Sequence, residues 1–355
     1  MGLRLLLIST PVGPLSSGLG GGVELLLTNL VQVLQDRGHR ITVVAPDQSV
    51  LPLPVQLVTL PGQWQPTAHT ASRTMAVIQP EPSVLSAMWD YARQVQGDYD
   101  LILHVAYDWL PFYLTTFFTT PIAHFVSMGS LTEAMDHVIT QVARTHPGTL
   151  GLCTHTQAQT FPDLESYFPL GGGLDLALYD YCETPGPDLA WVGRISPEKG
   201  LEDAIAVAIA SQTPLKILGK LENEAYWHEL QAKYPDAPVT YLGFFPTQEM
   251  QAHLRTCRAL VMTPHWVEAF GNVAIEALAC GVPVIAYRRG GPAEIVRHGQ
   301  TGWLVEPDSI PGLVTALSNI DALDRRACRR QAETEFSMAA LGDRFEQWFQ
   351  HILHP

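Results

Sequence analysis

The chain has 355 residues and a formal net charge of −14, from 21 lysines and arginines against 35 aspartates and glutamates. Its first 198 residues contain no lysine, which excludes the dense basic surface that a nucleic-acid-binding protein needs. The length predicts two domains, each large enough to bury its own core. The five cysteines are odd in number and include no C-x-x-C pair, so a reduced cytoplasmic protein is favoured over a disulfide framework or a zinc cluster.

The N-terminal segment predicts a strand, a helix and a second strand. Residues 3–8 are an apolar run, residues 23–34 carry apolar side chains at helical spacing, and Gly38 ends the helix before a strand at 41–45. Strand-sized and helix-sized apolar runs then alternate to the end of the chain. This alternation predicts an α/β protein with parallel sheets.

A glycine-rich loop, G-L-G-G-G at residues 18–22, precedes the first helix. The pattern G-x-G-x-x-V is also typical of a dinucleotide-binding turn. That turn follows its strand directly, whereas about ten residues separate the two here. A flexible surface loop and a ligand-contacting loop both remain open interpretations.

The predicted domain boundary is the cluster E-T-P-G-P-D at residues 183–188. It separates a first domain at residues 1–182 from a second domain at residues 183–339. No apolar run approaches the length of a membrane span, and the first domain has no Lys/Arg-rich amphipathic face. We therefore expect no integral membrane segment and at most a weak membrane association.

The second domain opens with A-W-V-G-R-I-S-P-E-K-G at residues 190–200, a short apolar strand that runs into a glycine-punctuated loop. Arg194 and Lys199 both lie in this loop, where each could give a phosphate one charge-assisted contact. In the alternative reading both side chains are solvated, and Ser196 and Pro197 only start a helix. The two interpretations are compatible.

Two carboxylates mark the segment T-P-H-W-V-E-A-F-G-N-V-A-I-E-A-L-A-C-G-V-P-V-I-A-Y at residues 263–287. Glu268 falls in a turn and Glu276 in the following helix, roughly 12 Å apart if both lie on or near that helix. The intervening residues 269–272 should present free backbone N–H groups at the helix N-terminus. A solvated helix residue and an ordinary first-turn acid are the alternative readings.

Taken in order, these segments resemble the family 4 glycosyltransferases. The resemblance is carried by G-R and K-G at 193–194 and 199–200, by Glu268 and Glu276, by the downstream G-V-P-V-I-A-Y-R-R-G-G-P-A-E-I-V-R-H-G-Q-T-G-W-L-V, and by the N-terminal strand, glycine loop and helix. It implies the GT-B architecture, in which two Rossmann-like doubly wound parallel-sheet domains face each other across a cleft. It also implies that residues 340–355 cross back onto the first domain.

The resemblance implies a role for each candidate residue around a nucleotide-sugar donor. Arg194 and Lys199 would neutralise the leaving diphosphate, Glu276 would bind the ribose, and Glu268 would hold the transferred sugar. His124 would lie beside that sugar, although a core histidine is the alternative, and we read His104 as structural. The remaining donor contacts would come from Gly21, Gly22, Gly193, Phe244, Phe270, Gly271 and Asn272.

The resemblance further implies a hexosyltransferase that retains anomeric configuration and needs neither a metal nor a cofactor. Asp98-Tyr99-Asp100 fits the D-x-D of metal-dependent glycosyltransferases of the other fold, but it lies at a strand start, so we predict no metal there. The expected donor is a nucleoside-diphosphate hexose, most plausibly a UDP-sugar, and the acceptor is an unknown sugar, small molecule or lipid. A nucleotide-sugar epimerase of the same fold and a non-catalytic nucleotide-sugar-binding protein are the alternatives.

Overall fold

The structure, a computed structural model, describes residues 2–68 and 71–354. It divides into two compact units, unit 1 (Met1–Gly172 with Met338–Pro355) and unit 2 (Gly173–Ser337). The observed boundary lies ten residues before the predicted one at 182/183. The reason is that residues 173–182 pack on unit 2: Leu174 N donates to Phe336 O, and the buried Tyr179 hydroxyl donates to Glu276.

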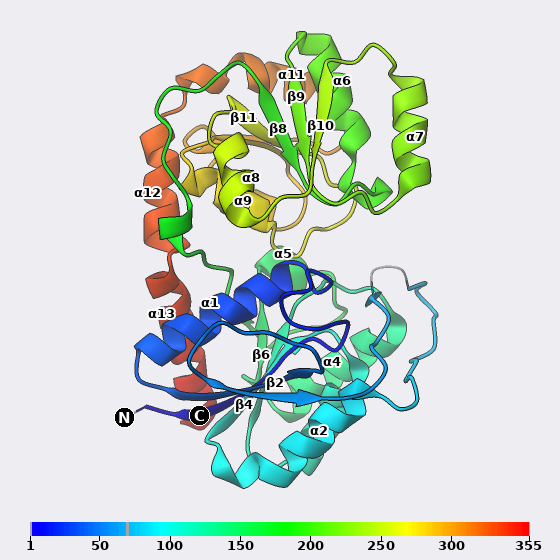
Figure 1. Ribbon diagram of the computed structural model, residues 1–355, viewed down its shortest axis with the longest axis vertical. Helices are drawn as coiled ribbons and strands as arrows, with labels where there is room; N and C mark the ends of the chain where they lie inside the picture. The colour runs from blue at the N-terminus through cyan, green and yellow to red at the C-terminus, as the bar shows by residue number, and fades with distance from the viewer. Residues whose placement is uncertain (1, 69–70, 355) are drawn as a thin grey trace. The chain divides into compact units, whose positions relative to one another are not determined.

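Unit 1 contains a seven-stranded parallel sheet in the order β3-β2-β1-β4-β5-β6-β7 (Figure 1). Its central strands are almost wholly apolar because helices cover both faces of a parallel sheet. The strands are β1 (Arg4–Ile8), β2 (Arg40–Pro46), β3 (Gln56–Leu60), β4 (Leu101–Ala106), β5 (Ile122–Val126), β6 (Leu150–Leu152) and β7 (Phe168–Pro169). The helices are α1 (Gly22–Asp36), α2 (Val84–Val95), α3 (Trp109–Leu114), α4 (Glu133–Thr145), α5 (His155–Ala158) and α13 (Met338–Leu353).

Helix α13 belongs to the core of unit 1 although it comes from the end of the chain. Phe345, Trp348 and Phe349 are fully buried, and Trp348 Nε1 donates to Gly148 O over 2.8 Å. Burying a large apolar side chain contributes about 1.5–3 kcal/mol, so these three residues supply a sizeable part of the stability of unit 1.

Unit 2 contains a six-stranded parallel sheet in the order β10-β9-β8-β11-β12-β13. Its strands are β8 (Leu189–Val192), β9 (Leu215–Leu218), β10 (Val239–Gly243), β11 (Ala259–Met262), β12 (Val284–Tyr287) and β13 (Gly302–Val305). Its helices are α6 (Leu201–Ser211), α7 (Glu224–Lys233), α8 (Thr247–Leu254), α9 (Asn272–Ala279), α10 (Pro292–Ile295), α11 (Ile310–Ser318) and α12 (Arg325–Glu335). The prediction of an α/β protein with two parallel, Rossmann-like sheets is confirmed.

Both sheets reverse their strand order at one point, between β1 and β4 in unit 1 and between β8 and β11 in unit 2. Open α/β sheets bind ligands beyond the carboxyl ends of the strands at such a point. In unit 2, the two loops that leave this point are residues 193–200 and 263–271, the loops that carry the candidate residues. Among residues 2–68 and 71–354, no helix combines the length and apolarity that crossing a bilayer requires.

Candidate functional site

The loops after β8 and β11 lie in direct contact at Gly200. This glycine has φ 63°, and a Cβ there would stand 2.0 Å from Thr263 O. Thr263 Oγ1 donates to Gly200 O over 2.7 Å, and His265 N donates to Glu198 O over 2.9 Å. A glycine is therefore required for the two loops to approach, and their side chains are brought together as a result.

Lys199 and Glu268 form an ion pair between these loops. Lys199 Nζ contacts Glu268 Oε2, and Trp266 Nε1 donates to the same oxygen over 3.1 Å. Lys199 Nζ also lies 4.8 Å from the centroid of the Trp266 ring, which adds a cation–π contact. Both charged side chains are mostly buried, at 18% and 16% exposed, so this pair is fixed in position.

Arg194 is held by two carboxylates on one side of the same loop. Its Nη1 lies 2.5 Å from Glu222 Oε2 and its Nη2 lies 3.1 Å from Glu198 Oε1. Ser196 Oγ donates to Glu198 Oε1 over 2.7 Å and so orients that carboxylate. Arg194 and Lys199 therefore both lie in the loop after β8, and both are paired with acidic side chains.

Helix α9 begins next to this pair. Its N-cap is Gly271, at φ 97°, and no side chain caps the helix. Phe270 is buried against Phe336, with ring centroids 6.2 Å apart, while Asn272 is half-buried. The first amides of α9 therefore have no side-chain cap within the described part of the chain, as the sequence predicts.

Glu276 lies inside α9 as a buried carboxylate, only 7% exposed. Burial raises its pKa to about 7, and the hydrogen bond from the Tyr179 hydroxyl, 3.0 Å from Oε1, acts in the opposite direction. The solvated-residue alternative is therefore wrong for Glu276. A buried, half-ionised carboxylate is costly and is typical of functional sites.

Gly193 and Phe244, the other two predicted contacts in unit 2, lie in very different surroundings. Gly193 continues β8 and packs so closely that a Cβ on Gly219 would stand 1.9 Å from Gly193 O. Phe244 directly follows β10 and is 70% exposed. An exposed phenylalanine beside a strand end is free to stack on a planar ligand, but no contact yet gives it that role.

In unit 1, the glycine loop is organised by Glu24, which the sequence analysis missed. Gly21 and Gly22 are exposed at the start of α1, and Gly21 has φ 57°. Glu24, in the first turn of α1, is buried and accepts from the amides of Ser16, Gly18 and Gly20, over 2.9, 3.2 and 2.6 Å. The flexible-loop alternative does not describe this segment, because a carboxylate fixes its backbone.

His124 lies in the core of unit 1, contrary to the expectation that it contacts a sugar. It is 0% exposed, its Nε2 lies 2.8 Å from Thr115 Oγ1, and its Nδ1 lies 3.1 Å from His104 Nδ1. Strand β5 is buried on both faces, so a histidine within it has no route to a ligand. The core alternative therefore holds for His124 as well as for His104.

The hydrogen-bond geometry also fixes the tautomers of this pair. Thr115 Oγ1 donates to Pro111 O over 3.1 Å and so accepts from His124 Nε2. His124 Nδ1 must then accept from His104 Nδ1, which leaves His104 Nε2 as a buried lone pair with no partner among the residues described. Burial lowers the pKa of His104 to about 3 and, with the neighbouring His104, that of His124 well below its ordinary value.

Comparison with known proteins finds relatives of unit 2. Residues 183–334 match the family Glycosyl transferases group 1. Over 181 residues the chain is 31% identical to glycogen synthase of Mycobacterium tuberculosis, a match that covers 48% of this chain and 43% of that protein. Over 156 residues it is 35% identical to D-inositol 3-phosphate glycosyltransferase of Pseudarthrobacter chlorophenolicus, covering 38% and 37%. The chain thus matches less than half the length of these curated relatives.

Solved structures resemble the whole chain. HepE of Anabaena, crystallised in complex with UDP, superposes with a TM-score of 0.78 at 18% identity over 98% of this chain and 100% of that one. Sucrose-phosphate synthase of Thermosynechococcus elongatus gives 0.77 at 18% identity over 99% of both chains. At these identities the likeness concerns the fold. The chain therefore has the fold of GT-B glycosyltransferases, and its residues 183–334 are similar to the glycosyl transferases group 1 family.

Proposed function

We propose that this protein is a retaining glycosyltransferase that transfers a hexose from a nucleoside-diphosphate sugar, most plausibly a UDP-sugar, to an acceptor hydroxyl. The observation that carries the proposal is the convergence of Lys199, Arg194, Glu268 and the start of α9 at the switch point of unit 2. The group 1 match covers all four features.

The two cations would bind the diphosphate of the donor. A diphosphate offers more oxygens and more charge than the carboxylates that now hold Arg194 and Lys199, so it can share or replace those partners. In the reaction, the bond from the sugar C1 to the phosphate oxygen breaks and a bond from C1 to the acceptor oxygen forms. Arg194 and Lys199 would stabilise the charge that develops on the leaving phosphate.

No general base is required from the protein in this scheme, because the leaving phosphate oxygen takes the proton of the acceptor hydroxyl. Glu268, fixed by Trp266 and by the ion pair, would accept hydrogen bonds from hydroxyls of the transferred sugar. The amides of Phe270, Gly271 and Asn272 would donate hydrogen bonds to oxygens of the same sugar. Because its neighbours already fix Glu268, little entropy is lost when the sugar binds.

Glu276 would bind the ribose. Within the described part of the chain, its buried carboxylate accepts a hydrogen bond from Tyr179, while a carboxylate can accept about four. Two ribose hydroxyls would satisfy the remaining acceptor capacity and reduce the cost of its burial. Phe244 is the candidate for stacking on the base, and Gly21, Gly22 and Gly193 for backbone contacts with the donor.

The test is a donor and acceptor screen with purified full-length protein. UDP-, GDP- and ADP-sugars are assayed by thermal shift, and those that bind are incubated with a panel of sugar, small-molecule and lipid acceptors. We expect a UDP-sugar to stabilise the protein and one acceptor to be glycosylated with retained configuration, as read by NMR of the anomeric proton. Conversion of the donor without any acceptor would indicate the epimerase, and binding without turnover on the whole panel would indicate the non-catalytic alternative.

A further inference from the structure

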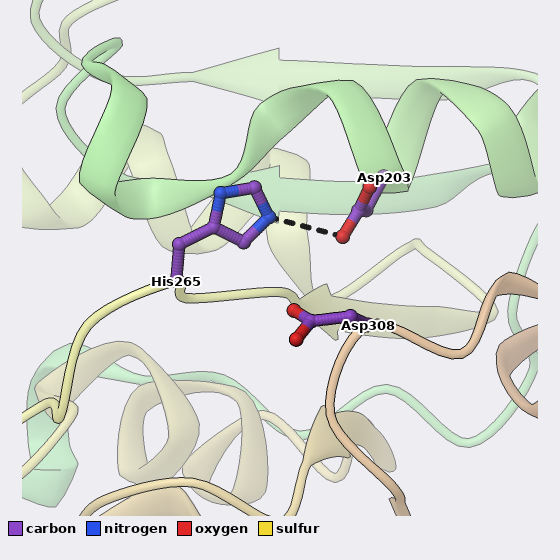
Figure 2. Close-up of side chains that lie close together, drawn as sticks. All are labelled: Asp203, His265 and Asp308. Carbon is purple, nitrogen blue, oxygen red and sulfur yellow. Dashed lines mark hydrogen bonds and ion pairs between the residues drawn. The ribbon is translucent and has the colours of Figure 1, made fainter.

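Three side chains that no sequence motif connects meet beside the Lys199–Glu268 pair. Figure 2 shows Asp203 on α6, His265 on the loop after β11 and Asp308 on the segment after β13. One potential ligand atom from each, an imidazole nitrogen and two carboxylate oxygens, lies within 4.8 Å of the others. His265 Nε2 is already 3.1 Å from Asp203 Oδ2.

These spacings are about 1 Å wider than those around a bound metal ion. Tetrahedral nitrogen and oxygen ligands that bind Zn²⁺ at about 2.0–2.2 Å lie roughly 3.3 to 3.6 Å from one another, so atoms that lie up to 4.8 Å apart need to close by about 1.2 Å. Two of the three side chains are exposed and Asp203 is half-buried, which leaves open coordination positions for water. A mixed imidazole and carboxylate set favours a transition metal over Mg²⁺, which prefers oxygen alone.

The two carboxylates each have an outer partner that orients them. The Tyr287 hydroxyl donates to Asp203 Oδ2 over 2.6 Å, and Arg289 Nη2 lies 2.8 Å from Asp308 Oδ2. The other ring nitrogen of His265, Nδ1, lies 3.9 Å from Glu202 Oε1. That distance is too long for a hydrogen bond, so Glu202 contributes negative charge near the imidazole without fixing its tautomer.

The backbone around His265 is fixed before any ion binds. His265 N donates to Glu198 O, Thr263 Oγ1 donates to Gly200 O, and Arg289 Nη1 donates to Pro264 O over 2.8 Å. Among the residues described, the three carboxylates near the imidazole, Glu202, Asp203 and Asp308, face two cations, Arg289 and Lys233, so negative charge remains in excess and attracts a cation. A site on a rigid backbone loses little affinity to reorganisation.

We propose that Asp203, His265 and Asp308 form a binding site for a divalent transition-metal ion of the Zn²⁺ class. His265 precedes Glu268 by three residues, and Asp203 follows Lys199 by four. The ion therefore clamps the loop that carries Glu268 to the helix that follows Lys199. Its role is structural, and it takes no part in the proposed transfer chemistry. The prediction from sequence that the chain needs no metal rested on the family resemblance, on the D-x-D segment and on the cysteine spacing, none of which involves these three positions.

The experiment is calorimetric titration of untagged, chelator-treated full-length protein with ZnCl₂, and in parallel with MgCl₂, without any nucleotide sugar. We expect one Zn²⁺ per chain and no saturable Mg²⁺ binding. His265→Ala and Asp308→Asn should each weaken Zn²⁺ binding at least tenfold. Asp203→Asn is a less specific test, because Asp203 also accepts a hydrogen bond from the Tyr287 hydroxyl. The matched control is His228→Ala, an exposed histidine on α7, which should bind Zn²⁺ as the wild type does.

X-ray absorption on the zinc-loaded protein gives the second readout. We expect one imidazole and only nitrogen and oxygen ligands at about 2.0–2.2 Å. Equal Zn²⁺ affinity in the wild type and His265→Ala would overturn the site, as would sulfur ligands, which would assign the binding to cysteines. Because neither measurement uses a nucleotide sugar, its outcome is independent of the transferase assay.

Discussion

The first βα connection of unit 1 and that of unit 2 occupy equivalent places in their sheets but differ in charge. In unit 1, the loop before α1 contains no lysine or arginine, and the Glu24 carboxylate accepts from three of its amides. In unit 2, the loop before α6 carries Arg194 and Lys199. Arg194 is paired with Glu198 and Glu222, and Lys199 is paired with Glu268. One loop carries its own anion, and the other has cations suited to an anion from solution.

This difference shows that a glycine-rich turn at a switch point does not by itself define an anion site. Glu24 is the third residue of α1 and reaches back to the amides before the helix, as the acidic member of a capping box does. A Cβ on Gly20 would stand 2.8 Å from Glu24 Cγ, so the glycine makes room for this carboxylate. The side chains that we propose to bind an anion are therefore concentrated in unit 2.

The largest expected effect follows from removing the cations of unit 2. Arg194→Ala and Lys199→Ala should each remove about 2–4 kcal/mol of transition-state stabilisation, which corresponds to roughly 30- to 1000-fold in kcat/KM. Steady-state kinetics on the donor identified by the screen measures this loss. Lys233→Ala, on the exposed face of α7, is the matched control and should leave kcat/KM unchanged. If both cation variants keep the wild-type kcat/KM, the charge difference between the loops before α1 and α6 does not explain the function.

The next effect concerns the Glu24 carboxylate, which accepts hydrogen bonds from the glycine loop of unit 1. Glu24→Gln replaces an acceptor oxygen with an amide donor, so at least one of the three loop N–H groups loses its hydrogen bond to a charged acceptor, which contributes about 1.5–3 kcal/mol. We expect hydrogen exchange of the Gly18 and Gly20 amides to accelerate accordingly. The control is Glu133→Gln, an exposed first-turn acid on α4. Unchanged exchange at these amides would show that the carboxylate does not hold the loop.

The two units should also respond differently to acid. His104, whose pKa burial lowers to about 3, binds a proton near pH 6.5 only when unfolded, so its contribution to stability is present at neutral pH and declines as pH falls. Between pH 7 and pH 5 this histidine alone should lower the free energy of opening of β4 and β5 by about 2 kcal/mol. Native-state hydrogen exchange at both pH values measures it, with β8 and β11 as the internal comparison. An equal loss in both sheets would argue against the histidine pair as its cause.

The smallest effect is on donor affinity. The Glu276 carboxyl, with a pKa raised to about 7, is ionised above that pH and then accepts hydrogen bonds from a ribose most strongly. We expect the Kd for UDP-glucose to rise about tenfold from pH 8 to pH 6 as the carboxyl gains its proton. UDP-glucose is a better ligand than UDP for this measurement, because the terminal phosphate of UDP itself titrates near pH 6. In Glu276→Gln this pH dependence should vanish, and its persistence would place the titrating group elsewhere.

The fold and the polar loops of unit 2 could be predicted from sequence because both are local properties. Hydrophobic spacing within 30 residues defines each βαβ unit, and Arg194, Lys199, Glu268 and Glu276 lie in turns or helices that short segments already specify. Parallel strands bring the ends of these segments to one edge of the sheet. Chain order and the rule for switch points therefore place these loops at one edge of the sheet, and the resemblance to the family 4 glycosyltransferases supplied the role expected of each residue.

The partners of these residues could not be predicted, because they come from distant positions. Glu222 is 28 residues from Arg194, and Tyr179 is 97 residues from Glu276. His124 was misplaced for a different reason: β5 is apolar on both faces, so its sequence has no alternation to show which way a histidine points. Glu24 was missed because positive φ angles in the glycine loop, invisible in the sequence, turn the amides toward it.

The two units differ in how they are built from the chain, because α13 follows unit 2 in the sequence but packs in unit 1. Unit 2 is one uninterrupted stretch, Gly173–Ser337, whereas unit 1 is assembled from two separate stretches, Met1–Gly172 and Met338–Pro355. On a ribosome, the sheet of unit 1 emerges before Phe345, Trp348 and Phe349, and the whole of unit 2 is synthesised in between. Unit 2 can thus complete its fold before unit 1, although unit 1 is begun first.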